Sequence, residues 1–215
     1  MRLGKWAAGA LGVAALGAVA VYAQYRNIEE PDYALVTEED AFQLRDYPSI
    51  VVAEVSHSGS RREASGASFR RLAAYIFAQD RPKGGEEIAM TAPVLQNRVS
   101  RDEEIAMTAP VLQDRSGDDK WRMRFVMPAK YTLESLPPAP ADITLAEVPA
   151  RLIAAVRFNG LASPADIAAK EEELKDWVSA QQLTPVGDFE YAFYDAPMVP
   201  GPLRRNEVMI EVATD

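Results

Sequence analysis

The sequence predicts an α+β fold, in which two β-β-α-β-β halves pack as a distorted antiparallel barrel flanked by two helices. The first observation is an internal match at an offset of 101 residues, which aligns Tyr47-Pro48 with Val148-Pro149. The second is that the alternating segments Ile50–His57 and 151–158 occupy equivalent places, and each precedes a helical pattern. Two four-stranded sheets with one helix each can bury their apolar faces against each other. We therefore expect a pseudo-two-fold axis between the halves.

The first half begins with loose alternation over Tyr33–Arg45, which predicts a strand, followed by a turn and the strand Ile50–His57. A helix near residues 61–79 should follow, because Ser60 and Glu63 have the spacing of a capping box. The apolar stripe of this helix is expected at Phe69, Leu72, Ala73 and Ile76. The alternating strand Trp121–Pro128 ends the half.

A duplicated block lies between that helix and that last strand. Glu86–Arg98 has the sequence EEIAMTAPVLQNR, and seventeen residues later Glu103–Arg115 has the sequence EEIAMTAPVLQDR. Each copy is expected to contain an MTAPV strand, so the extra copy adds a strand or hairpin to the fold. Because a proline cannot donate to a sheet ladder, Pro93 and Pro110 should each lie at an edge or a bulge.

The second half repeats the order of the first. After strand 151–158, a helix near residues 164–182 is expected, with Ser163 as its N-cap and Pro164 in its first turn. Two further strands, Phe189–Asp195 and Glu207–Val212, complete the half. The apolar stripe of the helix is expected at Ile167, Leu174 and Val178.

The N-terminus carries a targeting signal. Arg2 and Lys5 precede Trp6–Ala23, a run of eighteen residues without a charged or polar side chain. As a helix this run would be about 27 Å long, close to the roughly 30 Å of a bilayer core. Residues 1–23 are therefore a membrane anchor, or a signal peptide cleaved after Ala23 that would release a periplasmic protein. We favour a single-pass anchor in the inner membrane, with the domain on the exported side of the cell envelope.

The remaining chain is one domain. Residues 24–31 are a short polar tether, and residues 32–215 form the domain, with halves at about 32–128 and 140–212. The net charge of −9 argues against nucleic acid as a partner, because an acidic body repels phosphates. The absence of cysteine from the sequence excludes disulfides, thiolate metal sites and covalent c-type haem attachment.

Three motifs carry a family resemblance: IAMTAPV after the first helix, WRMRFVMP in the next strand, and Val-Pro-x-Arg in the second half. With them the chain resembles the SOUL haem-binding protein family from about Glu30 to Val212. The resemblance implies an eight-stranded distorted barrel of two pseudo-symmetric halves, and binding of haem or a related tetrapyrrole. The fold is also similar to gyrase-inhibitor-like effector-binding domains, which hold small molecules in a groove between the halves. The extra MTAPV copy departs from the family pattern.

Few residues could bind haem. His57 is the only histidine and therefore the only imidazole available to haem iron, but its counterpart in the second half is Phe158, which favours a structural position. Arg70 and Arg71 flank the apolar stripe of the first helix and could pair with haem propionates, the alternative being a solvated helix face. The methionines of the strands are more typical of core packing than of iron ligation.

An enzyme is not indicated. One histidine, no cysteine, and neither a G-x-S-x-G nor an H-E-x-x-H motif leave no nucleophile with a base, and no metal site besides haem iron held by His57. We therefore predict non-catalytic binding of haem or a related tetrapyrrole. The alternatives are an effector-binding module for another apolar small molecule, and an interaction protein of the envelope.

Overall fold

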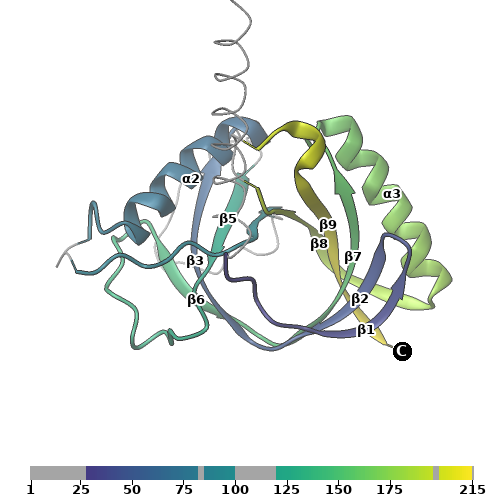
Figure 1. Cartoon of the computed structure of the whole chain (residues 1–215), viewed down its shortest axis with the longest axis horizontal. Coiled ribbons are helices and arrows are strands. Elements are labelled where there is room, and N and C mark those ends of the chain that lie inside the picture. Colours follow the sequence, from purple (N-terminus) through teal and green to yellow (C-terminus); the bar gives the residue numbers. More distant parts are fainter. Residues whose placement is uncertain (1–27, 82–84, 100–119, 196–198, 215) are drawn as a thin grey trace, which may run out of the picture.

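The computed structural model describes residues 28–81, 85–99, 120–195 and 199–214 (Figure 1). The expected anchor and the first half of the tether lie outside these residues. Within the described part of the chain, no helix is both long and apolar enough to cross a membrane. The strands and helices, in chain order, are β1 (Ala34–Glu39), β2 (Phe42–Tyr47), β3 (Ile50–Ser58), α2 (Arg61–Ile76), β4 (Val94–Arg98), β5 (Lys120–Val126), β6 (Thr144–Val148), β7 (Arg151–Asn159), α3 (Pro164–Ala180), β8 (Leu183–Phe193), the 3-10 helix η2 (Gly201–Leu203) and β9 (Arg205–Thr214).

The described strands form one antiparallel sheet in the order β1-β2-β7-β9-β8-β4-β5-β3-β6. The sheet is strongly curved, and α2 and α3 lie on its convex side (Figure 1). The expected α+β fold is therefore confirmed, but the sheet has nine strands and is not closed into an eight-stranded barrel. The extra strand arises because Tyr33–Arg45 is not one strand. Asp40, with φ of 52°, turns the chain and splits the segment into the hairpin β1–β2.

The strand order has the symmetry that the sequence match suggested. Apart from the edge strand β1, the strand order is symmetric about its centre, where β8 pairs with β4. Each strand of the first half has its counterpart at the mirrored place in the order: β2 with β6, β3 with β7, β4 with β8 and β5 with β9. β3 and β7 keep the offset of 101 residues, since they begin at Ile50 and Arg151. The outer strands cross between halves, because β2 pairs with β7 and β6 pairs with β3. Neither half is therefore a separate unit.

The first copy of the duplicated block forms less strand than expected. Thr91 makes only an isolated bridge to Glu29, and β4 begins at Val94, after Pro93. Pro93 therefore precedes the strand and occupies neither an edge nor a bulge. β4 pairs with a strand on each side, and its pairing starts at Val94, the first residue after the proline that has a backbone N–H to donate. The second copy, with Pro110, lies outside the described residues.

Both helices are close to their expected positions and slightly shorter, ending at Ile76 and Ala180. Ser163 and Asp166 form a complete capping box. At the other helix the Ser60 hydroxyl accepts from the Glu63 amide, as expected, and donates to the Glu63 carboxylate. Phe69 is 36% exposed, because the buried face of α2 is shifted toward Ala64, Ser68, Leu72, Tyr75 and Ile76.

The core has three parts. One cluster packs under α3 and includes Leu174, and a second packs under α2 and includes Leu72. The third, called here the concave cluster, comprises Val52, Leu95, Val126, Ile153, Ala155, Ala192 and Met209. Its members alternate along the strands with residues of the helix-side clusters, such as Ala154 on β7, so they face the concave side.

The hairpin β1–β2 is attached to α3 through an aromatic side chain. The Nε1–H of Trp177 donates to Glu39 over 2.8 Å, and Phe42 stacks on Trp177 with ring centroids 5.5 Å apart. All six residues of β1 are exposed, so this contact and the ladder to β2 hold the edge strand in place.

We expect Leu174→Ala to lower the free energy of unfolding by about 2–5 kcal/mol, because this fully buried side chain fills the cluster under α3. Leu161→Ala is the control, since Leu161 is 70% exposed and should cost little. Chemical denaturation followed by circular dichroism measures both. Equal losses in the two variants would contradict the packing described.

Candidate functional site

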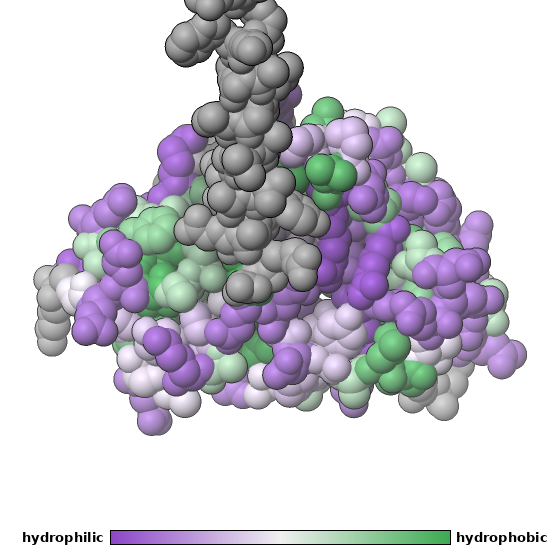
Figure 2. Space-filling model, in the orientation of Figure 1, coloured by the Kyte–Doolittle hydropathy of each residue, from purple (hydrophilic) through white to green (hydrophobic). Residues whose placement is uncertain are grey.

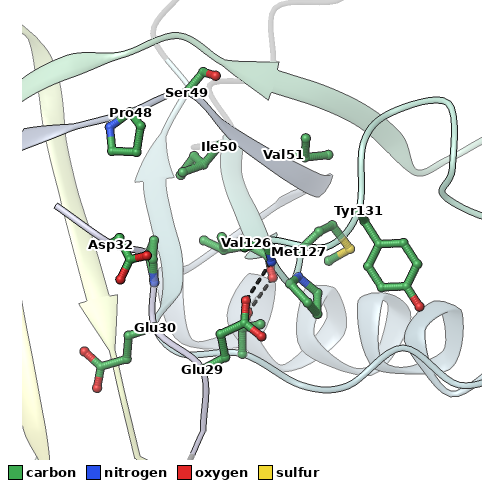
Figure 3. Close-up of a pocket in the computed structure, with 14 residues that line it drawn as sticks. Glu29, Glu30, Asp32, Pro48, Ser49, Ile50, Val51, Val126, Met127 and Tyr131 are labelled. Carbon is green, nitrogen blue, oxygen red and sulfur yellow. Dashed lines mark hydrogen bonds between the residues drawn. The ribbon is translucent and has the colours of Figure 1, made fainter.

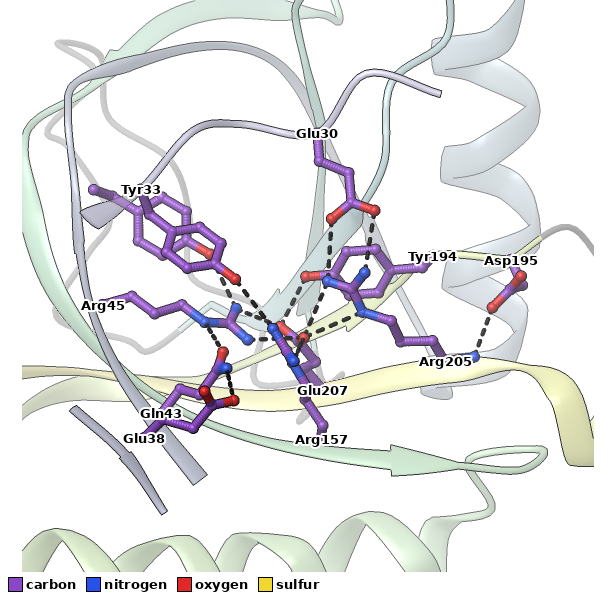
Figure 4. A network of polar contacts seen from close by, with 11 residues as sticks. Glu30, Tyr33, Glu38, Gln43, Arg45, Arg157, Tyr194, Asp195, Arg205 and Glu207 are labelled. Atoms are coloured by element: carbon purple, nitrogen blue, oxygen red, sulfur yellow. Dashed lines mark hydrogen bonds and ion pairs between the residues drawn. The ribbon is translucent and has the colours of Figure 1, made fainter. Parts of the chain in front are cut away.

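The concave face of the sheet carries a buried ion pair between β2 and β9. The Arg45 guanidinium donates to both carboxylate oxygens of Glu207, over 2.7 and 2.9 Å, and both side chains are 0% exposed. Their neighbours Leu44 and Val208 belong to the cluster under α3, so strand alternation directs Arg45 and Glu207 to the opposite face. This pair is the centre of the network in Figure 4.

Glu207 is the hub of this network. Besides Arg45, it accepts from Arg157 over 3.1 Å and from the Tyr194 hydroxyl over 2.8 Å. Arg205 lies 3.3 Å from Glu207 and also binds Glu30 (Figure 4). Burial by itself would raise the pKa of Glu207, but the hydrogen bonds and charges of Arg45 and Arg205 outweigh it and hold the pKa below 4.5. Glu207 is therefore an ionised carboxylate compensated by arginines.

A second charged cluster surrounds Glu190 on β8. Arg151 donates to both of its carboxylate oxygens, over 2.8 and 2.9 Å, and Arg124 donates to it over 3.1 Å. Arg124 also binds Glu54 over 3.0 Å. Burial would raise the pKa of Glu190, yet the bond to Arg151 and the charges of Arg151 and Arg124 lower it. This cluster lies at one end of a cavity of about 290 Å³ that Asn97 and Glu211 also line.

Three cavities adjoin one another and form a groove. The cavity at Glu190 shares Arg151 with a small one of about 20 Å³, whose floor includes Leu95, Ile153 and Met209. That small cavity shares Pro31, Pro48 and Ile50 with a third, of about 360 Å³. We call the three together the groove. It has a charged end at Glu190 and an apolar middle.

The other end of the groove is apolar with an acidic rim. Ile50, Val51, Met127 and Tyr131 surround the cavity of about 360 Å³, and Glu29, Glu30 and Asp32 lie along its edge (Figure 3). Glu29 is held by the Ala129 amide over 2.6 Å and Glu30 by Arg205 over 3.1 Å. In the view of Figure 2, hydrophilic side chains gather beside a hollow near the middle of the molecule.

Sequence comparison identifies the family. The model of the SOUL heme-binding protein family matches residues 28–211, nearly all of the described chain. The chain belongs to the SOUL family. It matches no curated protein sequence.

Solved structures place this SOUL domain in a wider fold group. The EcmrR C-terminal domain superposes with a TM-score of 0.56 at 11% identity, covering 85% of this chain and 99% of that one. A hydrolase from Listeria innocua superposes with a TM-score of 0.54 at 9% identity, covering 83% of this chain and 94% of that one. At such identities the likeness concerns the fold alone.

The residues that the sequence proposed for haem lie on the helix side of this SOUL domain. His57 is half-buried, and its Nδ1 lies 2.9 Å from the Ser68 hydroxyl of α2. Arg71 is bound by Asp142 and by Asp80, and Arg70 is exposed. The three cavities of the groove are lined by other residues. The structure therefore brings His57 and Arg71 to the same flank of α2 but separates both from the groove.

The sequence did not identify the buried charged residues of the concave face. Arg45 lies in the segment for which the sequence predicts one long strand, so its place on β2 of a hairpin was not expected. Its partner Glu207 is 162 residues away in the sequence. A local signal did exist. Glu207, Met209 and Glu211 alternate along β9, so two acidic residues share a face with a buried methionine. Carboxylates on a buried strand face require cationic partners, and this requirement points to a charged interior.

Acid should weaken this ion pair. Because the folded-state pKa of Glu207 lies below its unfolded value near 4.5, the ionised carboxylate stabilises the protein above that pH, and the stabilisation is lost as the pH falls through the folded pKa. At neutral pH, Glu207→Gln should cost about 3–5 kcal/mol, since Arg45 stays buried without its partner. The difference from wild type should shrink as the pH is lowered below 4.5.

Urea denaturation between pH 3 and 7 measures this difference. Glu172→Gln is the matched control, because the Glu172 side chain is 71% exposed and its pair with Lys175 contributes little. A Glu207→Gln variant as stable as the control at pH 7 would contradict the role given to the pair.

Proposed function

We propose that this SOUL domain binds haem or a related tetrapyrrole without chemical turnover, and that the macrocycle lies in the groove, whose middle is on the concave face. The family match supports the ligand class. The observation that carries the location is the groove itself, whose middle is formed by buried apolar side chains and whose two larger cavities adjoin it. Pockets for small molecules are typically apolar with a few placed polar groups.

The groove fits the macrocycle better than the iron. Ile50, Ile153 and Met209 offer apolar contact to a flat ring. Arg151 lines the groove at its charged end, where a ligand carboxylate would have to compete with Glu190. His57 packs against α2 and so lies on the other side of the sheet. Burial raises the pKa of Tyr47, which keeps its hydroxyl protonated and makes it a poor iron ligand. Met127 and Met209 are the remaining candidate ligands that line the groove.

The sequence-based site is the competing location for the same ligand. There His57 would supply the axial ligand, and Arg70 and Arg71 would pair with propionates. A propionate at Arg71 would have to compete with Asp142 and Asp80, which already satisfy that guanidinium. Arg70 carries no such constraint and is the accessible cation of the pair.

The absence of turnover is part of the proposal. His57 and Ser68 form a serine–histidine contact, but Ser68 is only 1% exposed, so no substrate reaches its hydroxyl. Within the described residues, no group of three or more histidine, cysteine or acidic side chains could hold a metal ion. The burial of Ser68 favours a binding module.

Haem and metal-free protoporphyrin distinguish iron-centred binding from binding through the ring. We expect both to bind residues 28–215 with dissociation constants within a few-fold of each other, measured by the Soret shift and by quenching of tryptophan fluorescence. His57→Ala should leave both unchanged. Loss of haem binding alone in His57→Ala would instead support axial ligation on the helix side.

Ile50→Asp tests the location. It places a charge where two cavities meet, and should weaken porphyrin binding by roughly tenfold or more. The control is Leu203→Asp, at an apolar side chain that is 58% exposed and does not line the groove. If Arg70→Ala combined with Arg71→Ala abolishes binding while Ile50→Asp does not, the ligand lies against α2.

If neither porphyrin binds, the alternatives gain weight. A thermal shift with another apolar small molecule would support an effector-binding module, and co-purification of a defined envelope protein would support an interaction protein. The absence of binding to duplex DNA at low salt is expected under each of these functions, because the domain is acidic.

We propose further that Trp6–Ala23 anchors the domain to the inner membrane, with residues after the tether on the exported side. The support is the length and apolar character of the run and its positive flank of Arg2 and Lys5. The protein should be purified from the membrane fraction of cells, and mass spectrometry should show that it retains its N-terminal residues. A mature chain beginning at Gln24 would identify a cleaved signal peptide instead.

A further inference from the structure

The position of β4 in the sheet is defined by contacts on every side. β4 pairs with β5 and with β8, and so joins the two halves. Leu95 is 4% exposed within the concave cluster, and Gln96 on the helix side accepts from the Ser65 hydroxyl over 3.0 Å. Upstream, Ile88 is 1% exposed under α2, and the Thr91 hydroxyl donates to the Val126 carbonyl. The segment Glu86–Arg98 therefore occupies one specific place in the fold.

The sequence contains a second segment with the same side chains. Glu103–Arg115 repeats Glu86–Arg98 at every position except one, where Asp114 stands in place of Asn97. Residues 100–119 lie outside the described part of the chain, and their sequence permits the second copy at the β4 position. Each apolar and hydroxyl contact of the first copy has a matching side chain in the second, with Leu112 equivalent to Leu95.

The connections permit either copy at this position. With the first copy in place, 21 residues (99–119) join Arg98 to Lys120. With the second in place, only Ser116–Asp119 would join Arg115 to Lys120, which is the length of a common hairpin loop. The connection from α2 to the strand would then be seventeen residues longer, because the second copy follows the first at an offset of seventeen. Because loop-closure entropy depends only on the logarithm of loop length, the two arrangements differ little in chain entropy.

A capping contact on α2 is compatible with both arrangements. Arg81 donates to the carbonyl oxygens of Tyr75 and Ile76 at the end of the helix, and these bonds do not involve the block. Its third bond is to the Glu86 carbonyl, a backbone group that the second copy also has at Glu103. The helix end therefore does not select one copy through a side chain that the other lacks.

We propose that the two copies are alternative β4 strands, and that the chain exchanges between two registers that differ by one charge in the groove. Asn97 pairs with Glu190 across the sheet and lines the cavity at the charged end. With the second copy in place, Asp114 would put a second carboxylate opposite Glu190. The exchange would thus change the charge balance of Arg124 and Arg151 with their acidic partners, and leave the apolar middle of the groove unchanged. The exchange itself stands independently of the function proposed above.

Blocking one copy at a time tests the exchange in the full-length chain. Leu95→Asp disables the first copy, because it places a charge in the concave cluster, and Leu112→Asp disables the second in the same way. We expect each single variant to unfold cooperatively with a Tm close to wild type, since the other copy can fill the position. The double variant should have a much lower Tm than wild type or fail to fold. Circular dichroism with thermal denaturation measures all four proteins.

Three results would overturn the proposal. Leu95→Asp as damaging as the double variant, with Leu112→Asp silent, would mean that only the first copy occupies the β4 position. The reverse pattern would mean that only the second copy does. A double variant as stable as either single would mean that neither leucine is required there.

Crosslinking provides a second measurement that does not depend on stability. The sequence contains no cysteine, so introduced pairs have no competing thiol. Leu95 is the cross-strand partner of Ala192 on β8, and Ala192→Cys is therefore combined with Leu95→Cys in one protein and with Leu112→Cys in another. We expect a disulfide to form in both under mild oxidation, as identified by peptide mass spectrometry. Ala192→Cys with Leu203→Cys is the control for random collision. Disulfide formation in only one of the two test pairs would contradict exchange.

Discussion

The exchange of outer strands between the halves is the constraint on which the rest of this fold depends. β2 leaves the first half to pair with β7, and β6 leaves the second half to pair with β3. The central ladder between β4 and β8 spans only four residue pairs, so these two outer ladders supply much of the attachment between halves. The same exchange accompanies the curvature of the sheet, because β2 lies beyond β7 at the outer side of the second half and β6 lies beyond β3 at the outer side of the first (Figure 1). The groove is therefore a product of the whole domain, and neither half could form it alone.

The curvature also explains why so many charges are buried. Side chains that point to the concave side converge, so Arg45 from β2 reaches Glu207 on β9 across the intervening β7. Such pairs cost desolvation and are retained only with near-complete hydrogen bonding, which Glu207 obtains from arginines and from Tyr194. The apolar middle of the groove adjoins the second compensated cluster, at Glu190, so this end of the groove is neutralised without a ligand.

Local patterns predicted the parts of the fold that depend on local physics. The alternation of β3 and β7, the caps at Ser60 and Ser163 and the stripe of α3 follow from spacing alone, and the structure confirms them. The split of Tyr33–Arg45 could not be predicted, because Asp40 adopts a positive φ without the glycine that usually announces such a turn. The charged network of the concave face could not be predicted for a different reason. Its partners lie far apart in sequence, and only the strand order brings them together. The haem residues were chosen because they can ligate iron or pair with propionates, and the sequence did not show that the groove would lie away from α2.

The contact of Trp177 with Glu39 and Phe42 has a practical consequence for observing this protein. The indole is 8% exposed and packs under an edge strand that is itself entirely exposed. Detachment of β1–β2 would uncover the ring and remove its hydrogen-bond acceptor, while Trp121 stays within the ladder between β3 and β5. The domain therefore contains two tryptophans, and detachment of the edge hairpin changes the surroundings of only one of them, Trp177. Comparison of Trp177→Phe with Trp121→Phe would separate local opening of the first hairpin from cooperative unfolding of the sheet, in a single optical experiment and without an added label.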